Sequence, residues 1–537
     1  MPSLPSRQRH PHAIFTLYPQ SPSAHVVVED TANAHLVSYN PQIERYGIDV
    51  GISGACSHQT LETLGRATDV GIHIPIRAIS RLQCSFEIND ESKAIILYDR
   101  SSEGTTEVYA WNQGKVCPFD DRRPRRVLVA PQLNELISMG HGDGLVKFRL
   151  IWWKKDARGL KSSYLVPNPN LARTYDIAET EKSSRPRTRI HTGGNKLIRY
   201  FENGQIGTGK FGVVYKAINV DTGKPMAVKV ISRPKQATGH DGDAFFLAVK
   251  NEVETLQRLV HEHIVGYIGC NEGVEEYKIF MDLCDGSLRS LATSLGPLPA
   301  AITDVLLEHM LQALAYLDSQ SMVHRDVKPE NILYRRIERH RGQHSYHFEL
   351  GDLGLCDNTV HIQPGVAGTT VYMAPEVARQ GQPTPKSDVW SLYMTELWAL
   401  DVGDFRKLED TLDNLDGIFT LVFASLEDSR VSCLKEMAEA DPDRRASAAE
   451  MLGKLFGTEG SSTPYSLAQS STKMMSMSVT ATRRPRSRQR RPRHLRSAPA
   501  PGMSKSPLPM ARRGTLSRWD REGGSTNGDG VSSHGVA

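Results

Sequence analysis

The chain has 537 residues and a net charge of +4, with 39% hydrophobic and 23% charged residues, which is typical of a globular protein with some unstructured length. At about 150 residues per domain, this length predicts several folded units. No segment approaches the roughly 18 consecutive apolar residues of a membrane helix, so we expect no membrane partner. The seven cysteines never form C-x-x-C, which indicates reduced intracellular thiols and argues against a zinc site or a disulfide framework.

Two segments with different patterns open the chain. Residues 1–44 are rich in Pro, Ser and His, and we expect them to be a disordered N-terminal segment. Residues 45–154 instead contain short β-branched and aromatic runs such as CSFEI, AIILY and VKFRLIWW, separated by Gly, Asp, Asn and Ser. Closely spaced strands without a helical period between them predict an all-β sandwich.

Three short motifs in the sandwich segment carry a family resemblance. They are Gly65-Arg66, Ser80–Cys84 and Asp99–Thr105. Together they resemble the forkhead-associated (FHA) domain, a β-sandwich that binds phosphothreonine peptides through loops at one end. The resemblance implies a phosphopeptide site at Arg66, Ser80, Arg81 and Ser102.

The chemistry of these side chains agrees with that implied ligand, because an Arg supplies a fork of donors and a Ser hydroxyl satisfies another phosphate oxygen. Two positions depart from the family pattern. Gln83 replaces the usual His, and Glu103 replaces an Asn that grips the peptide backbone. A carboxylate brings like charge towards a phosphate, so the alternative is a sandwich that has lost its ligand or binds an unphosphorylated partner.

After a linker over residues 155–198, a second folded unit is expected over residues 199–457. It opens with Gly207, Gly209 and Gly212 in G-x-G-x-x-G spacing, and the chain continues directly into a strand rather than a helix. Such a hairpin can bring backbone N–H groups close to phosphate oxygens. Lys229 follows in an apolar strand, where a lone ammonium needs a partner, and Glu252 in the next helical stretch is the expected one.

The segment VHRDVKPENIL, residues 323–333, carries the residues for phosphoryl transfer. Asp326 can accept a hydroxyl proton, Lys328 can lie beside the moving phosphoryl group, and Asn331 can help to hold a metal ion. Asp352, in Asp-Leu-Gly, is expected to add a carboxylate as a second metal ligand. We expect Lys229, Asp326, Asn331 and Asp352 to converge in a cleft between two lobes.

These motifs resemble those of the eukaryotic protein kinases of the serine/threonine type. The resemblance implies a bilobal α+β fold, ATP and Mg²⁺ as cofactors, Asn331 and Asp352 as metal ligands, and Asp326, Lys328, Lys229 and Glu252 as catalytic residues. Met281 occupies the gatekeeper position before the adenine-binding hinge. The implied nucleotide-binding residues are Ile206, Gly207, Thr208, Gly209, Lys210, Phe211, Gly212, Val213, Val214, Ala227, Lys229, Met281, Asp282 and Cys284.

The segment after Asp352 resembles an activation loop that closes at Ala-Pro-Glu, with Glu376 expected to pair with Arg445. Arg325, beside the catalytic Asp, favours regulation by an anion, because such an Arg usually needs one. The candidate phosphorylation sites are Thr359, Thr369 and Thr370.

Residues 458–537 are predicted to be a disordered basic tail. From Glu459 onwards there are fourteen Lys and Arg against four acidic residues, so the tail carries +10 and the rest of the chain −6. The run over residues 483–496 would fit a nucleic acid or an import receptor, and a merely solvated tail is the alternative. The basic run favours a nuclear rather than a cytoplasmic location for the protein.

The whole arrangement resembles the FHA-containing checkpoint-type kinases. The expected partners are therefore Ser/Thr-containing protein substrates and phosphothreonine-containing proteins. A pseudokinase scaffold is the competing hypothesis, but it requires that at least one catalytic position is replaced. The residues expected at these positions are all present: Lys229, Glu252, Asp326, Asn331 and Asp352.

Overall fold

The computed structural model describes two folded parts of the chain. The described residues are 8–51, 59–120, 124–154, 197–209, 212–233, 247, 249–250, 253–254, 256–273, 275–338, 344–352, 370–409, 411–412 and 414–457. The predicted linker, apart from residues 197 and 198, and the predicted basic tail lie outside this set.

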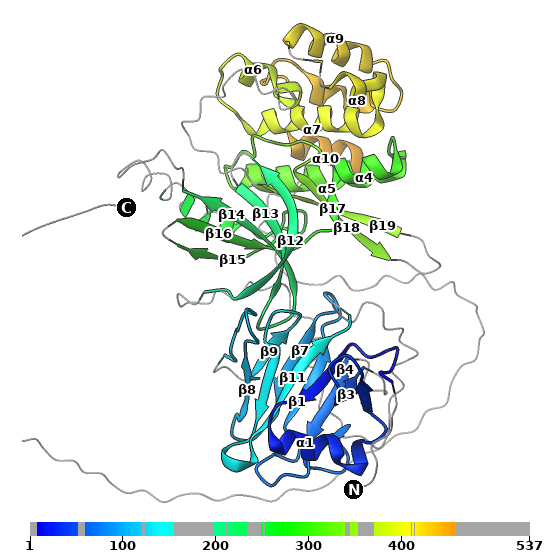
Figure 1. Cartoon of the computed structure of the whole chain (residues 1–537). Helices are drawn as coiled ribbons and strands as arrows, with labels where there is room; N and C mark the ends of the chain where they lie inside the picture. Colours follow the sequence, from blue (N-terminus) through cyan, green and yellow to red (C-terminus); the bar gives the residue numbers. More distant parts are fainter. Residues whose placement is uncertain are drawn as a thin grey trace, which may run out of the picture. The chain divides into compact units, whose positions relative to one another are not determined.

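The first part is a β-sandwich of two sheets (Figure 1). A six-stranded sheet has the order β2-β3-β1-β11-β10-β8, and a five-stranded sheet has the order β5-β4-β6-β7-β9. The strands are β1 Phe15–Pro19, β2 Val37–Asn40, β3 Arg45–Val50, β4 Thr60–Gly65, β5 Ile72–His73, β6 Cys84–Ile88, β7 Ile95–Asp99, β8 Thr106–Tyr109, β9 Arg126–Val129, β10 Leu136–Met139 and β11 Val146–Trp152. Buried apolar side chains from both sheets form one core.

The predicted disorder of residues 1–44 is wrong for the part that the structure describes, residues 8–44. β1 is a central strand, paired with β3 on one side and with β11 on the other. Phe15 and Leu17 are fully buried in the core, and the helix α1 Pro22–Glu29 buries Val27. The sandwich is therefore not purely β, and it begins near residue 13 rather than at 45, because burial of these apolar side chains outweighs the Pro- and Ser-rich composition.

Glu62 on β4 carries a carboxyl group that is almost completely buried in the sandwich core. Its carboxylate accepts a hydrogen bond from the backbone N–H of Thr63, but burial raises its pKa to about 8 from the ordinary value of 4.5. The folded protein therefore holds Glu62 protonated at pH 7, whereas the unfolded chain ionises it. Unfolding is favoured increasingly as the pH rises from 4.5 to about 8, by roughly 1.4 kcal/mol for each unit.

We expect Glu62→Gln, which mimics the protonated side chain in shape, to stabilise the protein at pH 8 and to change its stability little at pH 4.5. The measurement is the thermal unfolding midpoint of the full chain at both pH values. Glu91→Gln, at an exposed position in the turn between β6 and β7, is the control and should shift neither midpoint. A Glu62→Gln midpoint that follows wild type at both pH values would contradict this interpretation.

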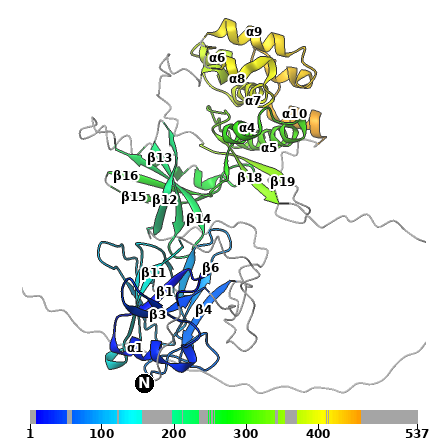
Figure 2. The same cartoon turned by 45° about the vertical axis from the view of Figure 1, so that its right-hand side comes forward.

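The second part has two lobes (Figure 2). The N-terminal lobe is a five-stranded antiparallel sheet in the order β12-β13-β14-β16-β15. Its strands are β12 Tyr200–Gly209, β13 Gly212–Asn219, β14 Pro225–Ser232, β15 Tyr267–Glu272 and β16 Glu276–Met281. The predicted bilobal α+β fold is confirmed.

The C-terminal lobe is mostly helical and contains a three-stranded sheet of β17 Gly286–Ser287, β18 Ile332–Glu338 and β19 His344–Leu350. The long helix α5 packs against α7, α10 and β19 (Figure 2). The labelled helices are α4 Leu288–Leu295, α5 Ala300–Ser319, α6 Pro375–Ala378, α7 Pro385–Leu400, α8 Phe405–Leu408, α9 Leu415–Ser425 and α10 Ala448–Phe456. Among the described helices, none combines the length and apolar character needed to span a bilayer.

Candidate active site

The glycine-rich segment forms the hairpin that the sequence predicts. β12 and β13 pair up to Gly209 and Gly212, which face each other at its tip. Gly212 has φ of 150°, and a Cβ added there would lie 2.2 Å from the carbonyl oxygen of Val230. Only glycine therefore lets this strand approach β14 so closely. The predicted nucleotide-contacting residues that lie on the hairpin strands are Ile206, Gly207, Thr208, Gly209, Gly212, Val213 and Val214.

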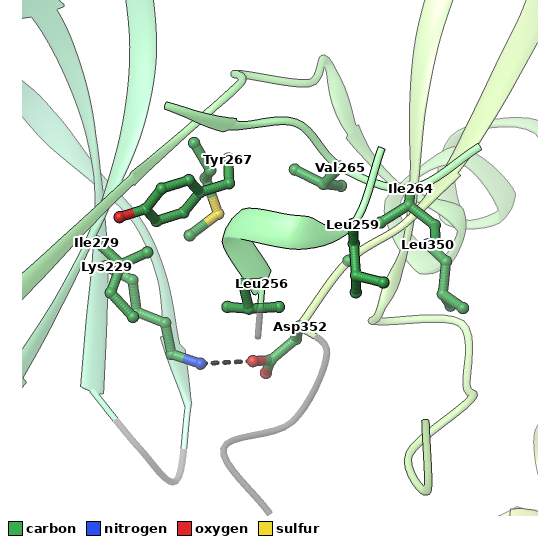
Figure 3. Close-up of a pocket in the computed structure, with 11 residues that line it drawn as sticks. Lys229, Leu256, Leu259, Ile264, Val265, Tyr267, Ile279, Leu350 and Asp352 are labelled. Atoms are coloured by element: carbon green, nitrogen blue, oxygen red, sulfur yellow. Dashed lines mark hydrogen bonds and ion pairs between the residues drawn. The ribbon is translucent and has the colours of Figure 1, made fainter. Parts of the chain in front are cut away.

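Lys229 extends from the middle strand of the N-terminal sheet towards the C-terminal lobe (Figure 3). It is 8% exposed, and its Nζ donates a hydrogen bond to Oδ1 of Asp352. An apolar pocket borders this ion pair, with Leu256, Leu259 and Ile279 in its lining. The ammonium of Lys229 and the predicted metal-binding carboxylate of Asp352, 123 residues apart in the chain, thus meet at the junction of the lobes.

The hinge lies on the edge of the same cleft. Ala227 on β14 pairs with Met281 at the end of β16, so the two predicted adenine-contacting residues are neighbours across the strands. The backbone N–H of Asp282 donates to Gly266 O at 2.8 Å, and burial raises the pKa of the Cys284 thiol to about 12. Cys284 is therefore an inert thiol at neutral pH.

The catalytic segment positions Asp326 through its own neighbours. Lys328 Nζ donates to Asp326 Oδ1 at 2.8 Å, and Asn331 Nδ2 donates to Oδ2 at 2.7 Å and to the backbone oxygen at 2.8 Å. Since the amide nitrogen of Asn331 is used in this way, its amide oxygen is the atom available to a metal ion. Gly351 N donates to Asn331 O at 2.8 Å, which joins this segment to the residue before Asp352.

Asp388, at the start of α7, supports the catalytic segment from below. It is 2% exposed, and its carboxylate accepts the backbone N–H groups of His324 at 2.7 Å and Arg325 at 2.8 Å. Burial raises the pKa of Asp388 despite these bonds. His324 Nε2 also hydrogen-bonds to Gly351 O at 3.0 Å, so a buried polar network fixes the backbone on both sides of Asp326.

Several predicted residues lie outside the described part of the structure. They include Glu252, so its pairing with Lys229 stays a prediction, and the whole of the activation segment up to residue 369. The predicted residues in this group are Lys210, Phe211, Glu252, Thr359 and Thr369, together with the side chain of Thr370.

One buried cluster around Glu409 was not predictable from any sequence pattern. Glu409, 6% exposed, accepts hydrogen bonds from Tyr372 Oη at 2.7 Å, Trp398 Nε1 at 2.8 Å and Arg289 Nη1 at 3.1 Å. Burial raises the pKa of Tyr372 far above its ordinary value, and the Glu409 charge adds to the effect. The cluster ties the end of the activation segment to α4 and α7.

In the sandwich, the structure brings the loops with the predicted phosphopeptide residues together. Arg66 N donates to Ser80 O at 3.0 Å, and Arg66 Nε donates to Ile79 O at 3.2 Å. The side chains of Arg66, Arg81 and Ser102 are exposed, and Ser80 is partly exposed.

Gln83 holds these loops in place from below. It is fully buried; its Oε1 accepts from Ser80 N at 3.0 Å, and its Nε2 donates to the hydroxyls of Thr105 and Thr106, both at 3.0 Å. Gln83 therefore bridges the loop of Ser80 and the loop of Ser102, and this departure from the family pattern is compatible with an intact loop structure.

The lobes, the glycine hairpin and the Lys229–Asp352 pair beside Asp326 define the second part as a protein kinase fold. The family model described as the protein kinase domain matches residues 200–456. The chain is 31% identical over 211 residues to the mitogen-activated protein kinase kinase kinase MST11 of Pyricularia oryzae, covering 36% of this chain and 22% of that one. It is 26% identical over 283 residues to serine/threonine-protein kinase 33 of Mus musculus, covering 50% and 56%.

Residues 200–456 thus match a protein kinase domain, and one relative of this part is named a serine/threonine-protein kinase. The chain spans less than two thirds of the length of either relative. A crystal structure of Rad53 residues 1–466 in complex with AMP-PNP aligns over 73% of this chain and 89% of that one, with a TM-score of 0.44 and 20% identity.

Proposed function

We propose that this chain is an active protein kinase that transfers the γ-phosphoryl group of Mg-ATP to serine and threonine hydroxyls of other proteins. The observation that carries the proposal is the meeting of Lys229 with Asp352 next to the bonded set of Asp326, Lys328 and Asn331. Lys328, two residues after Asp326, favours aliphatic hydroxyls, because tyrosine kinases of this family lack a lysine there.

The residues present fit a nucleotide and its metal. The hairpin offers a backbone without Cβ atoms at Gly207, Gly209 and Gly212, Lys229 offers a cation, and Asn331 and Asp352 offer the amide and carboxylate oxygens that Mg²⁺ prefers. ATP would supply the phosphoryl group, and the metal would neutralise the charge that develops on it.

The protein side chains then have distinct tasks. Lys229 would exchange its bond with Asp352 for the α- and β-phosphates, which frees the Asp352 carboxylate for the metal. Asp326, which forms an ion pair with Lys328, would orient the substrate hydroxyl and accept its proton. Lys328 lies where it can stabilise the transferred group, and positioning and electrostatics supply most of the rate.

An assay with the purified full chain and labelled ATP on arrays of serine, threonine and tyrosine peptides tests this proposal. We expect transfer to serine and threonine peptides and none to tyrosine peptides. A chain that binds ATP but transfers no phosphate to any peptide or to itself would instead be a pseudokinase scaffold.

We further propose that the sandwich is an FHA-like module that binds phosphothreonine peptides. Its support is the clustering of exposed Arg66 and Arg81 on loops that Gln83 braces, since two guanidinium groups can meet a phosphate of charge near −2. Glu103 is exposed on the same loop as Ser102, and its negative charge would repel a bound phosphate.

We expect Arg66→Ala to weaken binding of phosphothreonine peptides to the full chain at least about tenfold, because a charge-assisted bond to phosphate is worth roughly 1.5–3 kcal/mol. Glu103→Asn should strengthen it, since a repulsive carboxylate becomes a neutral donor. Fluorescence anisotropy with a degenerate phosphothreonine library and its unphosphorylated counterpart measures both effects. Equal affinity for the two libraries would favour a sandwich with an unphosphorylated partner.

A further inference from the structure

Three histidines from separate elements gather in the kinase domain on a side that the proposed chemistry does not use. His263 precedes β15, His309 lies on α5, and His347 lies on β19. One ring nitrogen from each lies within 4.8 Å of those of the other two. The ring centroids are 3.9 Å apart for His263 and His309, 4.8 Å for His263 and His347, and 5.2 Å for His309 and His347.

Backbone carbonyl groups fix the tautomers of two of the rings. His263 Nδ1 is 3.1 Å from Phe348 O, and His347 Nε2 is 3.0 Å from Glu262 O. Because a carbonyl oxygen only accepts, each of these nitrogens carries the proton, and the opposite nitrogen keeps its lone pair. A histidine that donates one N–H to a backbone carbonyl and offers its other nitrogen is the usual arrangement of a metal ligand.

The third ring, His309, has a lone pair that already accepts a hydrogen bond. His309 Nδ1 accepts from the backbone N–H of Phe348 at 3.2 Å. A cation would compete for this ring with that neutral hydrogen bond, and it would displace Gln312, which hydrogen-bonds to the His263 side chain. The loss is small beside the formation of metal–nitrogen bonds.

Burial and the nearby side chains also affect the charge of the histidine cluster. Burial, followed by the neighbouring His263 and His347 rings, lowers the pKa of His309 to about 3, and burial also lowers the pKa of His263. Glu262 Oε1 lies 4.0 Å from His263 Nε2 and can balance a positive charge.

We propose that His263, His309 and His347 bind one divalent transition-metal ion of the zinc type, with the Glu262 carboxylate or water as the fourth ligand. Neutral imidazoles suit Zn²⁺ far better than Mg²⁺ or Ca²⁺, which separates this site from the nucleotide-bound metal. Zinc–nitrogen bonds of about 2.0–2.1 Å require the rings to tilt out of their stack, and the χ2 torsion of histidine is soft enough to allow it.

Such an ion would fasten the segment before β15 to the C-terminal lobe. That segment already touches β19, with Leu350 N donating to His263 O at 2.8 Å and Val265 N donating to Leu350 O at 3.0 Å. Ile264, Val265 and Leu350 also line the pocket beside the Lys229–Asp352 pair (Figure 3). The ion would therefore stabilise one wall of that pocket.

The test uses the full chain, stripped with a chelator and titrated with Zn²⁺ in competition with a chromophoric chelator. We expect a binding equivalent with micromolar or tighter affinity, one added zinc in the native mass spectrum, and a higher unfolding midpoint. His309→Phe, which keeps a ring in the stack, and His347→Gln should each weaken this binding at least about tenfold. His344→Gln, exposed on the same strand as His347, is the matched control and should bind as wild type does.

The readout is metal binding and does not depend on phosphoryl transfer. Absence of a bound equivalent at about 100 µM free Zn²⁺, or an affinity that both variants leave unchanged, would overturn the proposal. Should His309→Phe fail to fold, as judged by circular dichroism, His347→Gln at a partly exposed position decides the question.

Discussion

Replacing Asp326 with asparagine is expected to lower kcat for peptide phosphorylation by about 10²–10⁴-fold, the range that a positioned general base contributes. The amide has the shape of the carboxylate, but its single oxygen can accept a hydrogen bond from only one of Lys328 and Asn331. The bond from Asn331 Nδ2 to the backbone oxygen of residue 326 is unaffected and should help to keep the segment in place. The amide cannot accept the hydroxyl proton. ATP affinity should change little, because Lys229, which is proposed to hold the phosphates, contacts Asp352 and not Asp326.

Steady-state kinetics and nucleotide binding, measured on the same preparations, separate these two effects. Asp318→Asn, at an exposed position near the end of α5, is the matched control and should leave kcat unchanged. A kcat that Asp326→Asn does not alter would mean that a contaminating kinase produces the signal or that another group serves as the base.

The kinase fold was predictable because its motifs are local and their order is strict. Gly207, Gly209 and Gly212 specify a hairpin, and VHRDVKPENIL specifies a segment whose side chains bond to one another over five residues. The meeting of Lys229 with Asp352, 123 positions apart, was predicted from the family resemblance and not from the spacing of the residues. The basic run over residues 483–496 lies outside the described residues, so nuclear location and nucleic-acid binding stay predictions.

The N-terminal boundary failed for a physical reason. The composition averaged over residues 1–44 is that of a disordered segment. A short apolar run such as Phe15–Pro19 is nevertheless enough to form a central strand when it pairs with a strand on each side. These partners lie about 30 and 135 residues further along, at β3 and β11. A local window cannot detect pairing at that separation.

Buried polar clusters were equally invisible in the sequence. Glu409 gathers donors from Arg289, Tyr372 and Trp398, and the three-histidine cluster joins His263, His309 and His347. Each residue is unremarkable in its own stretch of sequence, and only packing of helices against strands brings the set together. Gln83 differs, since its hydrogen-bonding capacity already favoured preservation of the loops.

Replacing Arg445 with methionine is expected to destabilise the kinase domain by about 3–5 kcal/mol, the usual effect of removing one partner of a buried ion pair. The Arg445 side chain is 0% exposed, and its guanidinium donates to both carboxylate oxygens of Glu376, at 2.7 and 2.9 Å. It also donates to the backbone oxygens of Glu439 and Lys386. Methionine fills the space but leaves Glu376 as an uncompensated charge, whereas Arg445→Lys keeps a charge and loses the paired geometry.

A double-mutant cycle with Glu376→Gln distinguishes the pair from the packing around it. Burial raises the pKa of Glu376, but the Arg445 bonds more than offset this and hold it below 4.5, so the stability from this group is present above that pH and is lost as the pH falls. Chemical denaturation at pH 7 should therefore show the double variant less destabilised than the sum of the single ones.

Lys454→Met, which breaks the exposed Lys454–Glu436 pair, should lose no more than about 1 kcal/mol. Equal losses for Arg445→Met and Lys454→Met would show that burial of the Glu376–Arg445 pair has no energetic consequence, and additive single losses would show that the two side chains act independently.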